Sequence, residues 1–264
     1  MSGHVLQPPV LEEAHRYILG MRVDATSYAR ATEQVIRWAT AGESRYVCVA
    51  NVHMVMEAYD DPGFRAIVNS ADLVTPDGMP LVWVLRRMGF PTQQRVYGPT
   101  LTLWVAREAA RRGIPVGFYG GHPEVAQGIS ENLRAKFPGL QVSYCYSPPF
   151  RPLTPQEDEQ VVQAINEAGV RILFVGLGCP KQERWMAQHK DRIRAVMIGV
   201  GAAFDFHAGR VRQAPPWLQE RGLEWLFRLL MEPRRLWRRY LWHNPRFVAL
   251  VARQLLREKA QGSL

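Results

Sequence analysis

The chain has 264 residues, of which 47% are apolar, and a formal net charge of +9. This length suits one large α/β domain with an appendage or two small domains, and the apolar content excludes global disorder. Three dispersed cysteines, Cys48, Cys145 and Cys179, indicate neither a disulfide framework nor a zinc site and favour a reducing, cytoplasmic setting. We expect neither a secretory signal nor a transmembrane helix, because the N-terminus lacks a basic and apolar leader and no window is sufficiently apolar.

The first 204 residues alternate short apolar runs with longer segments of helical periodicity. This alternation predicts an α/β fold with a parallel sheet flanked by helices. The predicted strands are 45–50, 114–120, 140–146, 170–176 and 194–201, and the predicted helices are 25–40, 100–112, 123–137, 154–168 and 181–191.

The alternation stops near residue 205, and the charge balance changes at the same place. Residues 205–264, called the tail below, contain 12 Arg or Lys and 5 Asp or Glu, which leaves only +2 of the net charge for residues 1–204. From Pro215 onward the pattern predicts two or three amphipathic helices punctuated by Pro233 and Pro245. The chain is therefore divided into a core, 1–204, and a basic helical tail with an anionic partner.

Ligands of open α/β sheets bind beyond the carboxyl ends of the strands, and three predicted strands end in glycine. Free N–H groups after Gly120 and Gly121 could hold a phosphate, although an ordinary tight turn explains them equally well. In "VGLGCPKQE", Gly178 permits close backbone approach and Gln182 could reach a uracil or ribose edge; the alternative is a helix cap with surface charges. The stretch 199–209 lacks the third glycine of a dinucleotide fingerprint.

A carboxylate and an arginine complete the candidate site. Asp77 lies in a Pro-Asp-Gly turn before the very apolar stretch 79–85, where burial would raise its pKa toward that of a general base. The simpler interpretation is a turn-forming aspartate. Eighteen residues later, Arg95 could clamp a diphosphate, or it could be a solvated surface arginine.

Together these stretches resemble the WecG/TagA/CpsF family of bacterial glycosyltransferases (glycosyltransferase family 26). The matching motifs run from about residue 17 to 245 and include "ANVHMVMEAYDDPGF", "TPDGMPLVW", "RVYGP", "LFVGLGCPKQERWM" and "IGVGAAFDFHAG". The resemblance implies a Rossmann-like core that inverts the anomeric carbon while moving a sugar from a UDP-sugar to a polyprenyl-diphosphate-linked saccharide. Such enzymes serve teichoic acid, common antigen and exopolysaccharide synthesis with N-acetylmannosamine, its uronic acid or glucose as donor sugar. The sequence does not identify the donor sugar or the oligomeric state, and the protein could be a monomer or a homo-oligomer.

The resemblance also implies roles for particular residues. Asp77 matches the aspartate of the family's Pro-Asp-Gly turn, the general base, and Arg95 matches the arginine that follows it. Asn51 matches an asparagine early in the first long motif, and Gln182 and Glu183 match the Pro-x-Gln-Glu segment, all as substrate contacts.

Two departures bear on these expectations. Val49 stands where some relatives have a threonine, which puts one donor contact in doubt. No Asp-x-Asp pair follows a predicted strand, and the acidic triplet 157–159 falls in a predicted exposed helix. We therefore expect no metal and no cofactor, with arginines and backbone amides holding the diphosphate instead.

The tail segment 233–242 combines arginines with large apolar residues. On a helix, Arg234, Arg235, Arg238 and Arg239 are predicted to share one face, and Leu236, Trp237, Tyr240 and Leu241 another. This composition is typical of an interfacial helix and predicts a peripheral enzyme on the inner face of the cell membrane, with arginines of the tail, and Trp237, as candidates to complete the diphosphate site. The alternatives are packing of the apolar face on the core, or nucleic-acid binding by the basic face; the family resemblance favours the membrane.

Two other functions compete with glycosyl transfer. A nucleotide-dependent oxidoreductase predicts a complete glycine fingerprint with an acidic residue about twenty positions later, and neither is evident. A non-catalytic, basic nucleic-acid-binding protein offers no role for the Asp77 turn.

Overall fold

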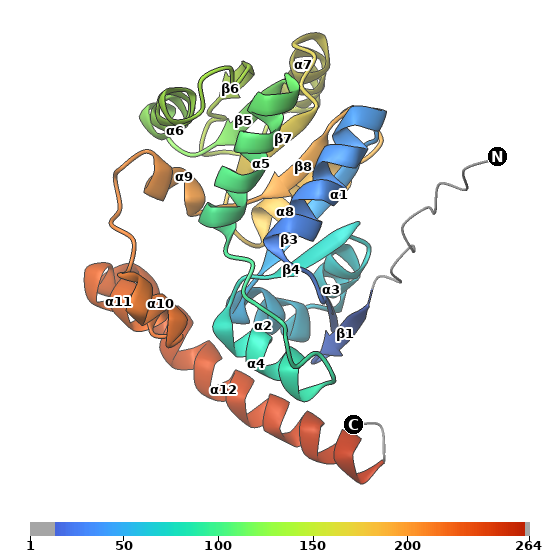
Figure 1. Cartoon of the computed structure of the whole chain (residues 1–264), viewed down its shortest axis with the longest axis vertical. Helices are drawn as coiled ribbons and strands as arrows, with labels where there is room; N and C mark the ends of the chain where they lie inside the picture. Colours follow the sequence, from blue (N-terminus) through green and yellow to red (C-terminus); the bar gives the residue numbers. More distant parts are fainter. Residues whose placement is uncertain (1–13, 262–264) are drawn as a thin grey trace, which may run out of the picture.

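A six-stranded parallel sheet forms the centre of the core (Figure 1). The computed structural model describes residues 14–261, apart from the side chains of Arg235 and Arg239. The strand order is β4-β3-β8-β7-β5-β6, and the strands are β3 (Arg45–Ala50), β4 (Leu73–Pro76), β5 (Val116–Gly120), β6 (Val142–Tyr146), β7 (Ile172–Gly176) and β8 (Val196–Gly199). Central strands such as "ILFVG" are apolar throughout because helices cover both faces of the sheet.

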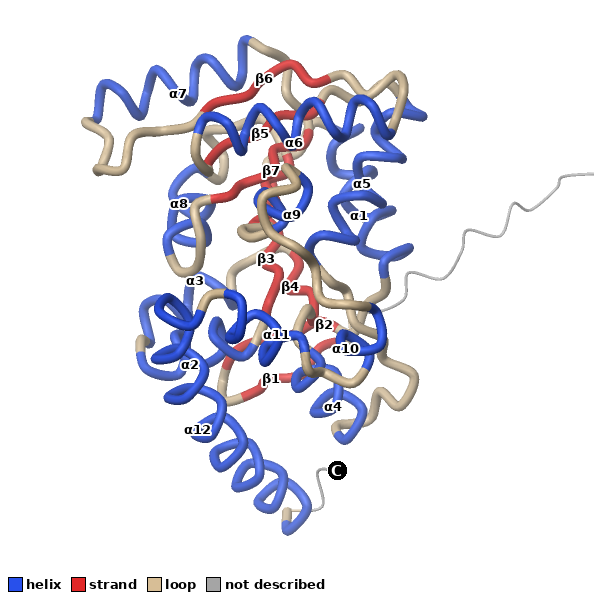
Figure 2. The backbone as a smooth tube through the Cα atoms, turned by 90° about the vertical axis from the view of Figure 1, so that its left-hand side faces the viewer, coloured by secondary structure: helices blue, strands red, loops and turns tan. Residues whose placement is uncertain are grey.

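Helices lie on both sides of the sheet (Figure 2). Successive side chains of a strand therefore enter two separate hydrophobic clusters, one on each face. Val47 and Val49 pack with α1 (Tyr28–Ala41), α5 (Gly98–Arg112) and α6 (Pro123–Lys136). Cys48 and Ala50 belong to the opposite cluster. Its helices are α2 (Val52–Asp60), α3 (Pro62–Asn69), α4 (Met79–Arg87), α7 (Pro155–Glu167) and α8 (Lys181–His189). The predicted Rossmann-like α/β architecture is confirmed.

All five predicted strands and all five predicted helices of the core are present, with ends shifted by a few residues. Thr154 caps α7 in a reciprocal pair with Glu157, which explains the clear start of that helix in the sequence. The prediction missed α2, α3 and α4, the strand β4, and the antiparallel hairpin of β1 (His15–Ile18) and β2 (Met21–Asp24). The hairpin strands and β4 have only four residues each, α2 and α3 are separated by one residue, and the very apolar start of α4 shows no helical periodicity.

The tail forms three helices that pack along the core, after the short helix α9 (Ala203–His207), which lies against α5 and α6 across the predicted boundary at residue 204. These are α10 (Pro216–Glu220), α11 (Glu224–Met231) and α12 (Pro233–Ala260). Pro233 begins α12 as predicted, but Pro245 lies inside this helix and does not interrupt it. In the part of the chain that the structure describes, no helix is long and apolar enough to cross a bilayer.

Helix α12 runs along the end of the core that carries α2 and α4 (Figure 1). Polar contacts fix it there at several points along its length. Arg246 makes a two-point ion pair with Asp60 of α2, with N···O distances of 2.9 and 2.7 Å. Further along, the Gln254 amide accepts from the backbone N–H of Leu19 and donates to the carbonyl of Tyr17, both in the hairpin. The tail is therefore part of the packed structure and not a loosely attached arm.

The predicted apolar face of α12 is divided between the core and the surface. Leu236 is buried and Tyr240 half-buried, whereas Trp237 and Leu241 are 47% and 62% exposed. At about 100° per residue, these four side chains span an arc of about 140°, which is within the width of one face of an amphipathic helix. The core covers only the part of this face that carries Leu236 and Tyr240, and the part that carries Trp237 and Leu241 is exposed.

The inner face of α12 should contribute measurably to stability. Phe247 is 3% exposed within the core cluster, while the neighbouring Val248 is 65% exposed. We expect Phe247→Ala to lower the free energy of unfolding by about 3–5 kcal/mol, because it leaves a cavity. The control Val248→Ala should change it by no more than about 0.5 kcal/mol. Urea unfolding measures both; equal effects would mean that α12 does not pack on the core as described.

Candidate active site

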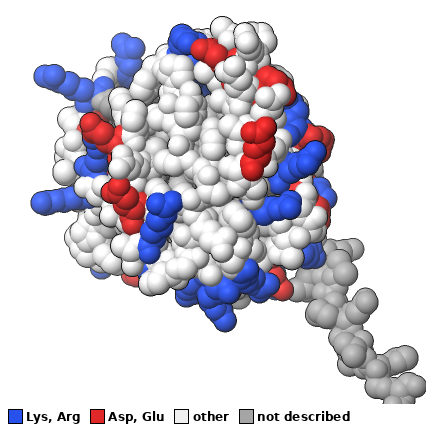
Figure 3. All heavy atoms as spheres, turned by 90° about the horizontal axis from the view of Figure 1, so that it is seen from above, with Lys and Arg blue, Asp and Glu red and all other residues white. Residues whose placement is uncertain are grey.

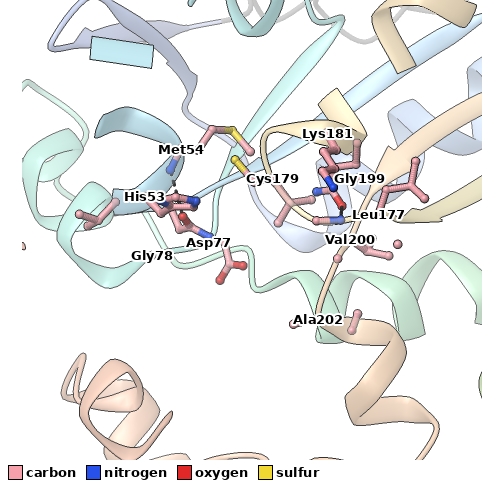
Figure 4. Close-up of a pocket in the computed structure, with 18 of the residues that line it drawn as sticks. His53, Met54, Asp77, Gly78, Leu177, Cys179, Lys181, Gly199, Val200 and Ala202 are labelled. Carbon is pink, nitrogen blue, oxygen red and sulfur yellow. Dashed lines mark hydrogen bonds between the residues drawn. The ribbon is translucent and has the colours of Figure 1, made fainter. Parts of the chain in front are cut away.

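A large cavity of about 1910 Å³ opens at the carboxyl ends of the parallel strands. Its lining includes the residues that follow β3, β4, β5, β7 and β8, and the tail helices form the facing wall. In Figure 4, Asp77 and His53 lie on one side of it and Leu177, Cys179 and Lys181 on the other. This position is where an open α/β sheet is expected to bind its ligand.

Asp77 is held at the end of β4 by backbone contacts to neighbouring segments. Its N–H and that of Gly78 both donate to the carbonyl of Ala50 at the end of β3, at 2.8 and 3.3 Å. On the other side, the N–H of Val96 donates to the carbonyl of Pro76. The turn is thereby fixed between two segments, and the carboxylate, 15% exposed, faces the cavity.

Arg95 contacts two carboxylates that lie far apart in the sequence. Its Nη2 lies 2.9 Å from Oδ1 of Asp77 and 2.7 Å from Oε2 of Glu224, at the start of α11. The Nε group also donates to the backbone carbonyl of Asp77, and the guanidinium lies 4.0 Å from the centre of the Tyr97 ring. Arg95 is therefore not a solvated surface arginine; it connects the turn to the tail.

The environment of Asp77 changes its acidity in the predicted direction. Burial raises the pKa of this carboxyl to about 6, Arg95 lowers it, and the negative charge of Glu224 raises it further. A carboxyl of this pKa is mostly ionised at neutral pH and still basic enough to accept a proton in a reaction.

Asn51 lies beside this turn at the start of α2. Its side-chain oxygen accepts a hydrogen bond from the N–H of Met54 at 3.2 Å, which caps the helix. The residue also lines the cavity, and its Cα lies 3.5 Å from the position that a Cβ on Gly78 would occupy. The structure thus explains Asn51 as a cap that also lines the cavity, and its contact with a substrate stays a prediction.

The two glycines at the end of β5 have a structural role that the sequence did not show. The N–H of Gly121 donates to the carbonyl of Gly176 at 3.0 Å, so this group is not free to hold a phosphate, whereas a phosphate contact through the N–H groups that follow it stays a prediction. Gly120 has a φ of +122°, and a Cβ there would lie 2.6 Å from the Gly176 carbonyl. These glycines let β5 and β7 approach closely where both strands end.

The Gly178 turn is closed by the amide of Gln182. Its Oε1 accepts from the N–H of Gly178 at 3.2 Å, and its Nε2 donates to Oε1 of the fully buried Glu183 at 2.7 Å. Both polar ends of the Gln182 amide are therefore used within the protein. Gln182 shapes the turn, and a contact with a base or ribose stays a prediction. Gly178 itself has a φ of +80° and open space beside it.

The tail reaches the cavity through arginines other than those predicted. Among the described side chains, Arg221 and Arg228 line the cavity, whereas Arg234, Arg238 and Trp237 do not. Arg228 lies 5.7 Å from the centre of the Phe206 ring and 4.0 Å from Glu232, and its Nε is buried without a hydrogen-bond partner within the described residues. Nothing in the sequence distinguishes Arg228 or Glu224 from other charged residues of the tail, so both were missed.

The acidic triplet 157–159 is engaged with basic side chains. Glu157 pairs with Arg151, while Asp158 and Glu159 both contact Arg192. The one group of three potential metal ligands found within the described residues lies elsewhere, at His53, Glu57 and His243.

Alanine substitutions at Gly120 and at Gly178 together test the structural role of Gly120. We expect Gly120→Ala to destabilise the protein by about 3 kcal/mol or more, because strained backbone and a steric clash add together. Gly178→Ala should cost only about 1–2 kcal/mol, since its Cβ enters open space. Thermal or urea unfolding of the two variants decides, and a larger loss for Gly178→Ala would contradict this description.

Comparison with known proteins is consistent with this arrangement. A sequence profile described as the glycosyl transferase WecG/TagA/CpsF family matches residues 16–261, which includes the core and most of the tail. The chain is also similar to the N-acetylglucosaminyldiphosphoundecaprenol N-acetyl-beta-D-mannosaminyltransferase of Bacillus spizizenii, with 32% identity over 207 residues that cover 78% of each chain. The protein therefore belongs to the WecG/TagA/CpsF family of glycosyltransferases.

Proposed function

We propose that this glycosyltransferase moves a sugar from a UDP-sugar to a polyprenyl-diphosphate-linked saccharide, with inversion, in the synthesis of a cell-surface polysaccharide. The observation that carries the mechanism is the shielded Asp77 carboxylate, which faces the cavity with a pKa of about 6. The name of the Bacillus relative favours N-acetylmannosamine among the three donor sugars expected from the sequence. Family membership leaves no role for the alternative of hydride transfer.

Asp77 acts as the general base in this proposal. It accepts the proton of the acceptor hydroxyl while that oxygen forms a bond to the anomeric carbon, and the bond between this carbon and the UDP oxygen breaks. Arg95 keeps the carboxylate ionised and oriented, because its guanidinium contacts Oδ1 and leaves the other oxygen for the proton. The backbone of Gly98 provides a further hydrogen bond to the carboxylate.

Arginines and backbone groups stabilise the leaving diphosphate, and no metal ion takes part. Arg228 is the strongest candidate from the tail, because it lines the cavity and its Nε has no hydrogen-bond partner among the described residues. Arg221 lines the same wall. The predicted contact between Arg95 and the diphosphate is not tested by the structure. Arg95 already contacts Asp77 and Glu224, so it would have to bind a phosphate in addition to these carboxylates.

The outer face of the tail binds an anionic membrane surface on the cytoplasmic side. Large exposed apolar side chains are concentrated on the tail helices: Trp217, Leu226, Leu230, Met231, Trp237, Leu241, Trp242, Val248 and Leu256. The exposed Arg234 and Arg238 lie among them on α12. At the end of the molecule opposite α12, which Figure 3 shows from above, acidic and basic side chains are interspersed. Apolar and basic residues together favour a lipid surface over nucleic acid.

A donor screen tests the proposed reaction. The full chain is incubated with a synthetic polyprenyl-diphosphate N-acetylglucosamine and, in turn, the UDP-activated forms of N-acetylmannosamine, its uronic acid and glucose, while UDP release and the lipid product are followed. We expect transfer from the N-acetylmannosamine donor, with the β configuration in the product. Transfer from another donor would correct the sugar alone, and no lipid-linked product from any of them would overturn the proposal.

Replacing the base should leave binding intact but remove most of the turnover. We expect Asp77→Asn to lower kcat by roughly 10²–10⁴-fold. In the unmodified enzyme, kcat/KM should fall as the pH decreases through about 6, because the protonated carboxyl cannot accept a proton. Glu224→Gln should move this fall to lower pH, since it removes a charge that raises the pKa of Asp77. Wild-type turnover in Asp77→Asn at saturating acceptor would exclude its role as the base.

The diphosphate contact of Arg228 can be separated from base or ribose contacts. We expect Arg228→Ala to weaken UDP binding about tenfold or more, and uridine binding much less, because the lost contact is to phosphate. Arg234→Ala is the matched control, as this arginine is exposed and does not line the cavity. Calorimetric titration of both ligands measures the difference, and an equal loss for UDP and uridine would place Arg228 away from the phosphates.

Vesicle co-sedimentation tests the outer face of α12. We expect the combined change Trp237→Ser and Leu241→Ser to reduce binding to anionic vesicles at all salt concentrations, because it removes apolar burial. Charge reversal at Arg234 and Arg238 should reduce binding mainly at low salt. Reversal at Arg111 and Arg112 of α5, which are 72% and 60% exposed, controls for net charge. If all three variants pellet with vesicles as the unmodified chain does, the tail is not the membrane contact.

A further inference from the structure

Helices α2 and α12 bring two imidazoles and a carboxylate together beside the cavity. His53 and Glu57 are one turn apart on α2, so their side chains lie on the same face of that helix. His243 approaches from α12, and its ring lies 5.3 Å from that of His53 between centroids, in an edge-on arrangement. None of these residues takes part in the proposed transfer.

The distances within this group suit coordination of a small cation. The three ligand atoms all lie within 4.8 Å of one another. His53 Nδ1 is 3.6 Å from Glu57 Oε1, and His243 Nε2 is 3.9 Å from the same oxygen. Around a tetrahedral zinc ion with bonds of about 2.0–2.1 Å, ligand atoms are separated by roughly 3.4 Å. Small side-chain rotations would therefore close the group on a metal ion.

The surroundings hold the ligands in place and leave one side accessible. One turn further along both helices, Asp60 and Arg246 form their two-point ion pair, which fixes the relative position of α2 and α12. The side chains of His53 and His243 are about 15% exposed, and both residues line the cavity. In Figure 4, His53 lies at the edge of the cavity near Gly78. A metal ion here could keep a water molecule as its fourth ligand.

We propose that His53, Glu57 and His243 form a binding site for a divalent transition metal of the Zn²⁺ type, which links the tail to the core. Two imidazoles and one carboxylate are a ligand set that this class of metal prefers, whereas Mg²⁺ and Ca²⁺ prefer oxygen ligands.

The site has a structural role. The metal ion takes no part in the departure of the diphosphate; it holds α12 against α2. Since α11 directly precedes α12, the same contact helps to keep Glu224 and Arg228 at the cavity wall.

Metal titration of the chelator-treated full chain tests the proposal. We expect calorimetry to show one equivalent of Zn²⁺ bound, and Co²⁺ to give the absorption spectrum of nitrogen and oxygen coordination. His243→Gln and Glu57→Gln should each weaken Zn²⁺ binding at least about tenfold. His15→Gln, a histidine of strand β1 outside the group, is the matched control and should leave the affinity unchanged. The proposal is overturned if Zn²⁺ does not bind stoichiometrically, or if His243→Gln and Glu57→Gln bind it as tightly as His15→Gln does.

Hydrogen exchange distinguishes a link between helices from adventitious surface binding. Zn²⁺ should slow exchange of the backbone amides in residues 233–260 of the unmodified protein but not of His243→Gln. Measured without metal, the variant should exchange like the unmodified protein, which would exclude loss of folding as the cause. If Zn²⁺ binds but leaves exchange in α12 unchanged, the structural role is wrong.

Discussion

The ion pairs of Arg95 fix the relation between the catalytic turn and the tail. One guanidinium lies between Asp77, at the end of a core strand, and Glu224, at the start of a tail helix. All three side chains are at most 16% exposed, so loss of one partner would leave an uncompensated charge in a poorly solvated place. The charge state of Asp77 and the position of α11 are therefore coupled: protonation of this carboxyl weakens one of the two contacts that hold Arg95.

Helix α12 both packs on the core and lines the cavity with its inner side. Phe247 and Val251 belong to the core cluster, Leu236 is also buried, and all three line the cavity together with Tyr240. The outer side leaves apolar and basic residues exposed, in the combination proposed to meet lipid. The apolar inner side of α12 therefore serves the core and the cavity at once, while the basic residues stay on the exposed side.

Much of the core could be predicted because its signals are local. A strand such as β3 appears in the sequence as an uninterrupted apolar run, and the Asp77 turn is visible as Pro-Asp-Gly. The partners of those residues could not be predicted, because contacts between positions 95 and 224, or 53 and 243, depend on how the tail folds back. The role of the glycines at the end of β5 could not be predicted for a related reason. The local sequence shows that a small residue is needed there, but it does not show whether a ligand or a neighbouring strand requires it.

The geometry of α12 also limits which acceptor the proposed enzyme can use. One helix forms both the exposed outer face and part of the cavity wall, and a helix with its side chains is about 10–12 Å across. If the outer face rests on lipid headgroups as proposed, the reacting hydroxyl has to be carried above the membrane surface to enter the cavity. A diphosphate and a first sugar between the lipid and that hydroxyl provide such a spacer. The acceptor class proposed from the family is thus also the one that the dimensions of the tail favour.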